Sequence, residues 1–454
     1  MMTDDVRCAN ASCSRRDMLN FAAVAGAGPL LEACAKVPTL APALPAVILP
    51  GGLGVRGTRL VQRLTQGTRP FIASGVNYWA GPVLARDRAG WDVVRRDLDQ
   101  IQSLGLNTVR TLGATEGPDT EPLRIVPAIQ HAPGQYDPAG VAGVIRFADE
   151  LRRRGLFGIF VLNNFWPWSG GMAQYVAWAG GGRIPYPPPQ PGGDFDAYTA
   201  FAARFYEEER ARETYRAYVR FLVPKLGANP AVVWELANEP RGMNHVEAYR
   251  GWIDETARLI KSLAPGHLVT TGSEGETSSP EDAGLDVVKD HASPAIDFIT
   301  CHIWAQNWGW VGPDTLAEDM PAGIDHALRY LRRHAALAAT AGKPLLVEEF
   351  GFPRDGASFD PRAPTTLRDR YFDAIYRAVV GLIEDSPVAG VLPWAWSGAA
   401  RPPRPGQYWR PGDPFVGDPP HERQGWYGIY DTDTTIHLVR DASARLARAS
   451  SALV

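Results

Sequence analysis

The chain has 454 residues, of which 45% are hydrophobic and 21% are charged, and its formal net charge is -4. This length suits a single α/β barrel with long loops, and the small net charge argues against a nucleic-acid-binding surface or a polybasic membrane patch. With four cysteines, three of them before residue 35, a disulfide framework or a cysteine-based metal site in the body of the protein is also excluded.

The first segment has the pattern of an export signal. The motif SRR at positions 14–16 precedes a weakly apolar stretch that ends at Leu31, an order typical of twin-arginine signals. The sequence LEAC, which ends at Cys34, resembles a lipobox, whereas ACA at 33–35 fits cleavage to a soluble product. We therefore expect residues 1–35 to be an export signal and the protein to act in the periplasm or outside the cell, either soluble or lipid-anchored at Cys34.

A Pro-rich segment follows and is interpreted as a tether over residues 36–65. Later in the chain no segment reaches 18 uninterrupted apolar residues, so no membrane span is expected.

From about residue 69 onward, apolar runs and amphipathic segments alternate. Strands are predicted at 71–79, 107–113, 157–165, 231–240, 267–275, 295–304, 344–351 and 390–398. Helices are predicted at 91–105, 142–155, 201–227, 246–263, 325–342, 367–385 and 439–449. Eight such strands favour a (β/α)₈ TIM barrel over an open sheet, in one catalytic domain that spans 66–454 and carries long loop insertions.

Polar and aromatic residues gather at the carboxyl ends of these strands, where barrel enzymes hold their active sites. In chain order, the candidates are Arg110, Asn163, Asn164, Trp166, Asn238, Glu239, Glu274, His302, Trp304, Glu349 and Trp394. Two further acids, Glu235 and Glu348, lie inside strands and are interpreted as structural partners of a cation. The sequence lacks a His-Glu-x-x-His motif, a Gly-x-Ser-x-Gly elbow and a Gly-x-Gly-x-x-Gly loop, so neither a catalytic metal nor a cofactor is expected.

Glu239 and Glu349 end strands four and seven, which face each other across a barrel mouth. Such a pair suits the cleavage of a glycosidic bond, in which one carboxyl group donates a proton and the other attacks the anomeric carbon. An Arg near Glu349 would keep that residue ionised, and the resulting anion would keep Glu239 protonated. Because side chains alternate along a strand, Glu348 and Glu349 are expected to point to opposite faces.

The stretches WELANEPR (234–241) and LLVEEFG (345–351) resemble the acid/base and nucleophile motifs of glycoside hydrolase family 5, a group of retaining (β/α)₈ enzymes. The stretch 161–181 is similar to the third-strand loop of the β-mannanase branch of that family, and HLVTTGSEG (267–275) and DFITCHIWAQNWGW (297–310) fit the same branch. The likeness extends from about residue 70 to 430.

This resemblance implies specific roles by position. Glu239 would be the acid/base and Glu349 the nucleophile, and Asn238 would bind the sugar 2-hydroxyl. Arg110 and His302 would support the nucleophile, and Trp394 would lie under the reacting sugar. The family usually has Tyr two residues after the sixth-strand His, and this sequence has Trp304 instead.

The leading interpretation is a monomeric retaining endo-β-1,4-mannanase that acts on mannan or glucomannan. An exo-acting β-mannosidase on the same scaffold is a close alternative, because the inserts 183–198 and 397–428 could close one end of the cleft. A β-1,4-glucanase is a further alternative, and a non-catalytic sugar-binding protein is another.

Overall fold

The computed structural model describes residues 49–276 and 283–453, so the predicted export signal and Cys34 lie outside the described residues. Within the compact unit of residues 43–454, eight strands form one parallel sheet. In chain order they are β4 (Ala73–Asn77), β5 (Thr108–Leu112), β8 (Phe157–Val161), β9 (Val232–Glu235), β10 (Val269–Thr270), β11 (Ile299–Ile303), β12 (Leu345–Phe350) and β13 (Val388–Val391).

The sheet curls into a nearly closed barrel. Its strand order is β10-β9-β8-β5-β4-β13-β12-β11, and a parallel bridge between Thr270 and Phe298 links its two outer strands. Every residue of these strands is buried, as expected for parallel strands that are covered on both faces. The predicted (β/α)₈ barrel is confirmed.

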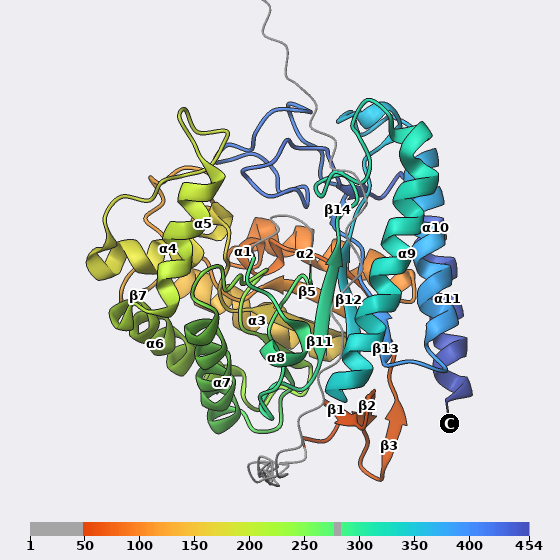
Figure 1. The fold of residues 1–454 in the computed structure, drawn as a ribbon, viewed down its shortest axis with the longest axis horizontal. Helices are drawn as coiled ribbons and strands as arrows, with labels where there is room; N and C mark the ends of the chain where they lie inside the picture. Colours follow the sequence, from red (N-terminus) through yellow and green to blue (C-terminus); the bar gives the residue numbers. More distant parts are fainter. Residues whose placement is uncertain (1–48, 277–282, 454) are drawn as a thin grey trace, which may run out of the picture. The chain divides into compact units, whose positions relative to one another are not determined.

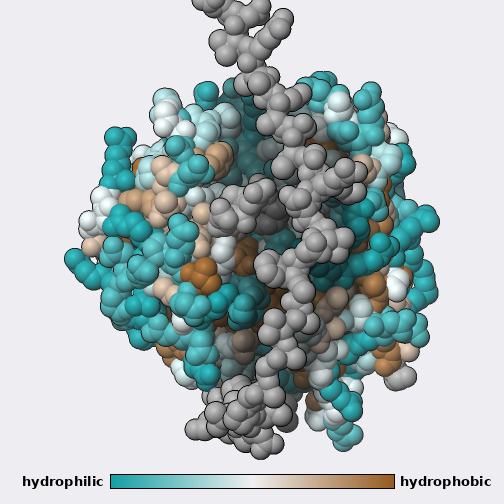
Figure 2. Space-filling model, in the orientation of Figure 1, coloured by the Kyte–Doolittle hydropathy of each residue, from teal (hydrophilic) through white to brown (hydrophobic). Residues whose placement is uncertain are grey.

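Helices surround the sheet (Figure 1). Those described are α1 (Gly81–Leu84), α2 (Arg88–Ser103), α3 (Pro138–Arg154), α4 (Gly171–Val176), α5 (Phe195–Ala203), α6 (Glu209–Leu226), α7 (Val246–Leu263), α8 (Val287–Asp290), α9 (Leu316–Ala341), α10 (Thr366–Leu382) and α11 (Thr435–Ala452). None of the helices in the described part of the chain is both long enough and apolar enough to cross a membrane. The coloured part of the face seen in Figure 2 is mostly hydrophilic, with hydrophobic residues scattered among hydrophilic ones.

Local sequence signals set the ends of these helices. The side chain of Asp87 accepts a hydrogen bond from the Gly90 amide at the start of α2. At α3, Asp137 caps the first turn and Gly155 ends the helix in the left-handed conformation, with φ of 70°.

The segment before the barrel differs from the prediction. Residues 53–65 were assigned to a tether, but β1 (Leu53–Arg56), β2 (Arg59–Arg63) and β3 (Thr68–Pro70) form an antiparallel sheet. Its apolar side chains Leu53 and Leu60 pack with residues at the starts of the barrel strands. The sheet therefore covers the amino-terminal end of the barrel (Figure 1), and the tether can extend no further than about residue 52.

Two other predicted elements are divided. The single helix expected at 201–227 is α5 and α6, which are separated by a short turn at 204–208. The strand expected at 390–398 ends at Val391, and residues 396–398 form β14 (Trp396–Gly398), which pairs with β15 (Ile429–Tyr430). A small hairpin of β6 (Gln130–Ala132) and β7 (Gln135–Tyr136) was not predicted.

Candidate active site

A cavity of about 720 Å³ lies at the carboxyl end of the barrel strands. This volume falls in the range of about 300–1,000 Å³ that is usual for small-molecule sites. Loops that follow β8 to β13 contribute to its walls. Of the candidates from the sequence, it is lined by Trp166, Asn238, Glu239, Glu274, Trp304, Glu349 and Trp394.

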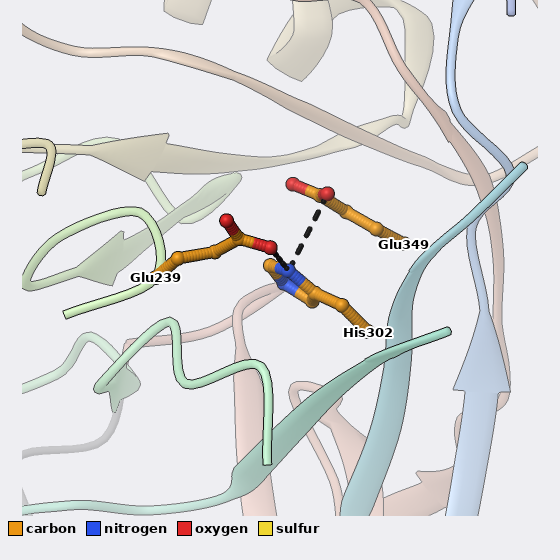
Figure 3. Close-up of side chains that lie close together, drawn as sticks. All are labelled: Glu239, His302 and Glu349. Atoms are coloured by element: carbon orange, nitrogen blue, oxygen red, sulfur yellow. Dashed lines mark hydrogen bonds and ion pairs between the residues drawn. The ribbon is translucent and has the colours of Figure 1, made fainter. Parts of the chain in front are cut away.

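The two expected catalytic carboxyl groups lie close together in this cavity. One oxygen of Glu239 is within 4.8 Å of one oxygen of Glu349. Glu239 projects from the loop after β9 and Glu349 from β12 (Figure 3). Carboxyl groups about 5–5.5 Å apart are typical of glycosidases that retain anomeric configuration, whereas inverting enzymes need about 6.5–9.5 Å to fit a water molecule. The geometry therefore suits double displacement.

The acids Glu348 and Glu349 do not alternate as expected. In the pairing of β11 with β12, Cys301 lies opposite Val347 but His302 lies opposite Glu349, so Glu348 is an extra residue in a bulge. Both carboxylates consequently approach the same two cations. Glu349 reaches the cavity, whereas Glu348 stays fully buried with its oxygens 3.6 Å from Arg110 Nε and 3.7 Å from His302 Nε2. A bulge beside a functional side chain is a common way to redirect it.

Arg110, on β5, organises the base of the site. Its guanidinium donates to both oxygens of Glu235 at 2.6 and 2.7 Å, to Asn238 Oδ1 at 2.8 Å and to Glu349 Oε1. Burial alone would lower the pKa of Arg110, but the charges of Glu235, Glu348 and Glu349 raise it well above its usual value. The structure thus places Arg110 beneath Glu349, and Glu235 has the cationic partner that was expected.

His302, on β11, lies between the two cavity carboxylates. Its Nδ1 is 2.7 Å from Glu239 Oε1 and 3.3 Å from Glu349 Oε2 (Figure 3). Burial alone would lower the pKa of His302, but the charges of Glu349 and Glu239 raise it to about 10. The two carboxylates thus favour the protonated form of His302. The ring contacts Glu239 as well as Glu349, the residue that the resemblance implied it supports.

The second oxygen of Glu239 is held by Trp166. The indole Nε1 donates to Glu239 Oε2 at 2.6 Å, and the Arg241 guanidinium lies over the Trp166 ring, 4.8 Å from its centroid. Glu239 has a φ of 47°, which is unusual for a residue with a side chain and is found mainly at functional sites. The loop after β9 is thus shaped to aim this carboxyl group into the cavity.

The charge state of the pair differs from the expectation. Burial would raise the pKa of Glu239, but the hydrogen bond and charge of His302 outweigh it and lower the pKa to about 2. Burial raises the pKa of Glu349, although His302 and Arg110 act against this. The expectation differs from these pKa directions because it did not include the hydrogen bond between His302 and Glu239.

Trp304 occupies the position where the resemblance predicts Tyr. Its indole Nε1 donates to Glu349 Oε2 at 3.2 Å. The nucleophile therefore has a hydrogen-bond donor from this position, although an indole replaces a phenol.

Other candidates lie beside the cavity. Asn163 and Asn164 do not line it, because their side chains hold the loop: Asn163 Oδ1 accepts from the Asn164 amide and Asn164 Oδ1 accepts from the Trp166 amide. Of the two roles considered for these candidates, substrate binding and support of the site, the hydrogen bonds indicate support of the loop that carries Trp166. Glu274 lines the cavity, where it accepts two hydrogen bonds from Arg241 at 2.5 and 3.1 Å.

The insert 397–428 was considered from the sequence as a wall of the cleft, but the residues with which it lines the cavity were not identified. His421 and Glu422, in the insert 397–428, line the cavity, and the His421 ring lies parallel to Trp168 with the ring centroids 6.5 Å apart. Burial raises the pKa of Glu422 well above its usual value, and nearby carboxylates add to this effect. These residues lie in an irregular loop, away from the ends of the predicted barrel strands. The spacing of apolar residues, which located those strands, therefore did not point to them.

Glu239, His302 and Glu349 also have ligand atoms close enough to hold a metal ion. The contacts of His302 Nδ1 with both carboxylates already account for the positions of these atoms. The group is therefore interpreted as an acid–base site.

Residues 58–451 match the family model described as GH family 5 beta-mannosidase-like. Among curated proteins, the chain is 30% identical over 358 residues to a putative mannan endo-1,4-beta-mannosidase 5 of Oryza sativa subsp. japonica, which covers 73% of this chain and 67% of the rice protein. It is also 30% identical over 382 residues to mannan endo-1,4-beta-mannosidase 3 of the same plant, covering 75% and 74% of the two chains.

A solved structure with a similar fold is the glycoside hydrolase family 5 mannosidase from Rhizomucor miehei. It superposes with a TM-score of 0.81 at 29% identity and covers 89% of this chain and 99% of the fungal one. An endo-1,4-beta-mannanase from the same fungus superposes with a TM-score of 0.62 at 22% identity, over 87% and 99% of the chains, which shows the shared fold.

Proposed function

Because the chain belongs to the glycoside hydrolase family 5 β-mannosidase-like proteins, we propose that it hydrolyses β-mannosidic bonds in mannan-type glycans with retention of configuration. The observation that carries this proposal is the pair of carboxyl groups, Glu239 and Glu349, whose oxygens approach within 4.8 Å in the barrel-mouth cavity.

In the first step, a Glu349 oxygen attacks the anomeric carbon, and the bond from that carbon to the leaving oxygen breaks. Glu239 donates its proton to that oxygen, so an ester between the sugar and Glu349 remains. In the second step, Glu239 removes a proton from water, which attacks the same carbon from the other face and releases Glu349.

Glu239 must carry a proton when the substrate is bound, so its pKa must rise on binding. His302 is placed to allow this rise. The leaving oxygen would compete for the Glu239 carboxyl group, and His302 Nδ1 is already 3.3 Å from Glu349. Moving the imidazolium hydrogen bond from Glu239 to Glu349 would raise the pKa of the acid and lower that of the nucleophile.

We further propose that the enzyme removes single sugars from the non-reducing end. The reacting sugar would lie on Trp394, and the space beyond it holds the buried rings of Trp79 and Trp168, whose centroids are 5.2 and 6.4 Å from the Trp394 ring. His421 lies parallel to Trp168, so the insert after β13 reaches the loop after β8 across the ends of β4 and β5. We infer that these side chains limit the glycone side of the cavity to one sugar.

Endo-action is the second candidate, because both rice relatives have the name mannan endo-1,4-beta-mannosidase. The two modes give different first products. With mannohexaose labelled at its reducing end, exo-action should release unlabelled mannose and labelled mannopentaose before any shorter labelled product. Chromatography at less than about one-tenth conversion measures this directly.

Early labelled mannobiose or mannotriose would instead establish endo-action. Cellohexaose is the control for the glucanase alternative, and it should be cleaved much more slowly than mannohexaose. Faster cleavage of cellohexaose would contradict the substrate assignment.

We also propose that the chain is exported through the twin-arginine pathway, which is supported by the SRR motif at 14–16 and the apolar stretch after it. Replacing Arg15 and Arg16 together by Lys should leave the precursor in the cytoplasm, as measured by cell fractionation and immunoblotting.

The Cys34→Ser variant is the matched test of a lipid anchor at Cys34. A wild-type protein in the membrane fraction and a Cys34→Ser protein in the soluble fraction would support lipidation, whereas export of the double Lys variant would contradict the pathway.

A further inference from the structure

We propose that Phe195 is a stacking platform for the sugar on the leaving-group side of the scissile bond. The enzyme would then prefer an oligosaccharide to a β-mannoside with a small leaving group. This inference rests on the proposed hydrolysis of β-mannosides, and it adds a specificity residue in the insert 183–198.

The acid/base marks the side on which the leaving group lies, because its proton must reach the leaving oxygen. Trp166 is the aromatic residue in direct contact with Glu239, through the hydrogen bond from its Nε1. Phe195 packs edge to face on Trp166, with ring centroids 6.4 Å apart and planes at 83°. The order outward from the carboxyl group is therefore Glu239, Trp166 and Phe195.

Phe195 is unusually exposed for a residue of its kind. In the described part of the chain, Leu64, Phe195 and Tyr408 are the large hydrophobic residues more than a third exposed, and Phe195 has the highest value at 48%. Phe195 and Tyr408 both line the cavity. Aromatic side chains that line a concave site are typical of ligand pockets, and the exposed face of Phe195 is open to a ligand in this cavity.

The ring is held on a rigid support. The Asp194 side chain caps α5 by accepting hydrogen bonds from the amides of Asp196 and Ala197 at 2.8 and 3.1 Å. One turn later, the buried Tyr198 donates to the Phe165 carbonyl at 2.8 Å and stacks on Trp166 with the planes at 12°. Phe195 is thus presented at a fixed place relative to the acid/base.

Polar groups near this ring favour a sugar over an alkyl or aryl group. Asp196, on the same helix, lines the cavity, as do the paired Arg241 and Glu274 beside Trp166. A pyranose offers an apolar C–H face for an aromatic ring and hydroxyl groups around its edge for polar side chains. A small or wholly apolar leaving group would match only part of this surface.

The test compares mannotriose with β-mannosyl fluoride, whose leaving group has no ring and needs no protonation. For each variant, kcat/KM is measured on both substrates and their ratio is taken. Phe195→Ala should lower the mannotriose-to-fluoride ratio about two- to tenfold, the size of one aromatic stacking contact, mainly through KM for mannotriose. Phe195→Trp should restore the ratio. Leu64→Ala, which removes another exposed apolar side chain far from the cavity, should keep the wild-type ratio.

A Phe195→Ala enzyme with an unchanged ratio, or with equal losses on both substrates, would overturn the platform even if β-mannosides are hydrolysed. A wild-type enzyme that cleaves neither substrate would instead overturn the proposed function itself.

Discussion

Glu349→Ala is expected to lose turnover by about 10⁴-fold or more in kcat, the scale seen when a group that reacts covalently is removed. The neighbouring Glu348 cannot take over this role, because the bulge leaves it fully buried and outside the cavity lining. The fold should persist, since Arg110 keeps its two hydrogen bonds to Glu235. Steady-state kinetics on mannotriose and thermal unfolding measure the two effects separately.

Glu348→Gln is the matched variant. The side-chain oxygens of Glu348 lie 3.6 Å from Arg110 and 3.7 Å from His302, and they accept no hydrogen bond from any described residue. Losing this charge should lower the free energy of unfolding by about 1–3 kcal/mol, as is usual for a disturbed buried polar group, and kcat should fall much less than in Glu349→Ala. Activity in Glu349→Ala combined with its loss in Glu348→Gln would reverse the assignment.

Glu239→Ala is expected to slow the hydrolysis of mannotriose by about 10²–10⁴-fold, because the departing sugar oxygen then leaves without a proton. An activated substrate such as 2,4-dinitrophenyl β-mannoside needs no proton, so its first step should stay fast. The second step lacks its general base, and the ester on Glu349 should therefore accumulate. A rapid burst of dinitrophenol followed by slow turnover, together with a mass increase of one mannosyl group on the protein, would measure this. Equal slowing of both substrates without a burst would contradict the acid/base role.

The barrel could be predicted because apolar residues follow different patterns in the two kinds of element. They form continuous runs in buried strands and recur every three or four residues in amphipathic helices. α7, for example, has the predicted bounds, because Tyr249, Trp252, Ile253, Ala257 and Ile260 form one buried stripe. The sheet of β1 to β3 was missed because its strands are short and polar on one face, and prolines just before it suggested a tether. The break between α5 and α6 was missed because apolar and charged residues continue through the turn.

The positions of Glu239 and Glu349 in the cavity agree with their place at strand ends. Their environment was harder to predict, because it depends on contacts between distant strands. The bulge at Glu348 is a property of how β11 and β12 pair, and neither strand shows it alone. The bond from His302 to Glu239 and the approach of His421 to Trp168 likewise join segments 63 and more than 200 residues apart, without a local signal.

The measurement that tests the central claim most directly is azide rescue of Glu239→Ala on 2,4-dinitrophenyl β-mannoside. Azide is a nucleophile that needs no general base, and removal of the Glu239 side chain opens space for it beside the sugar–Glu349 ester. We expect azide to restore turnover and NMR to identify the product as β-mannosyl azide, formed by two inversions at the anomeric carbon. The absence of rescue, or an α-configured azide, would contradict a retaining mechanism with Glu349 as nucleophile and Glu239 as acid/base.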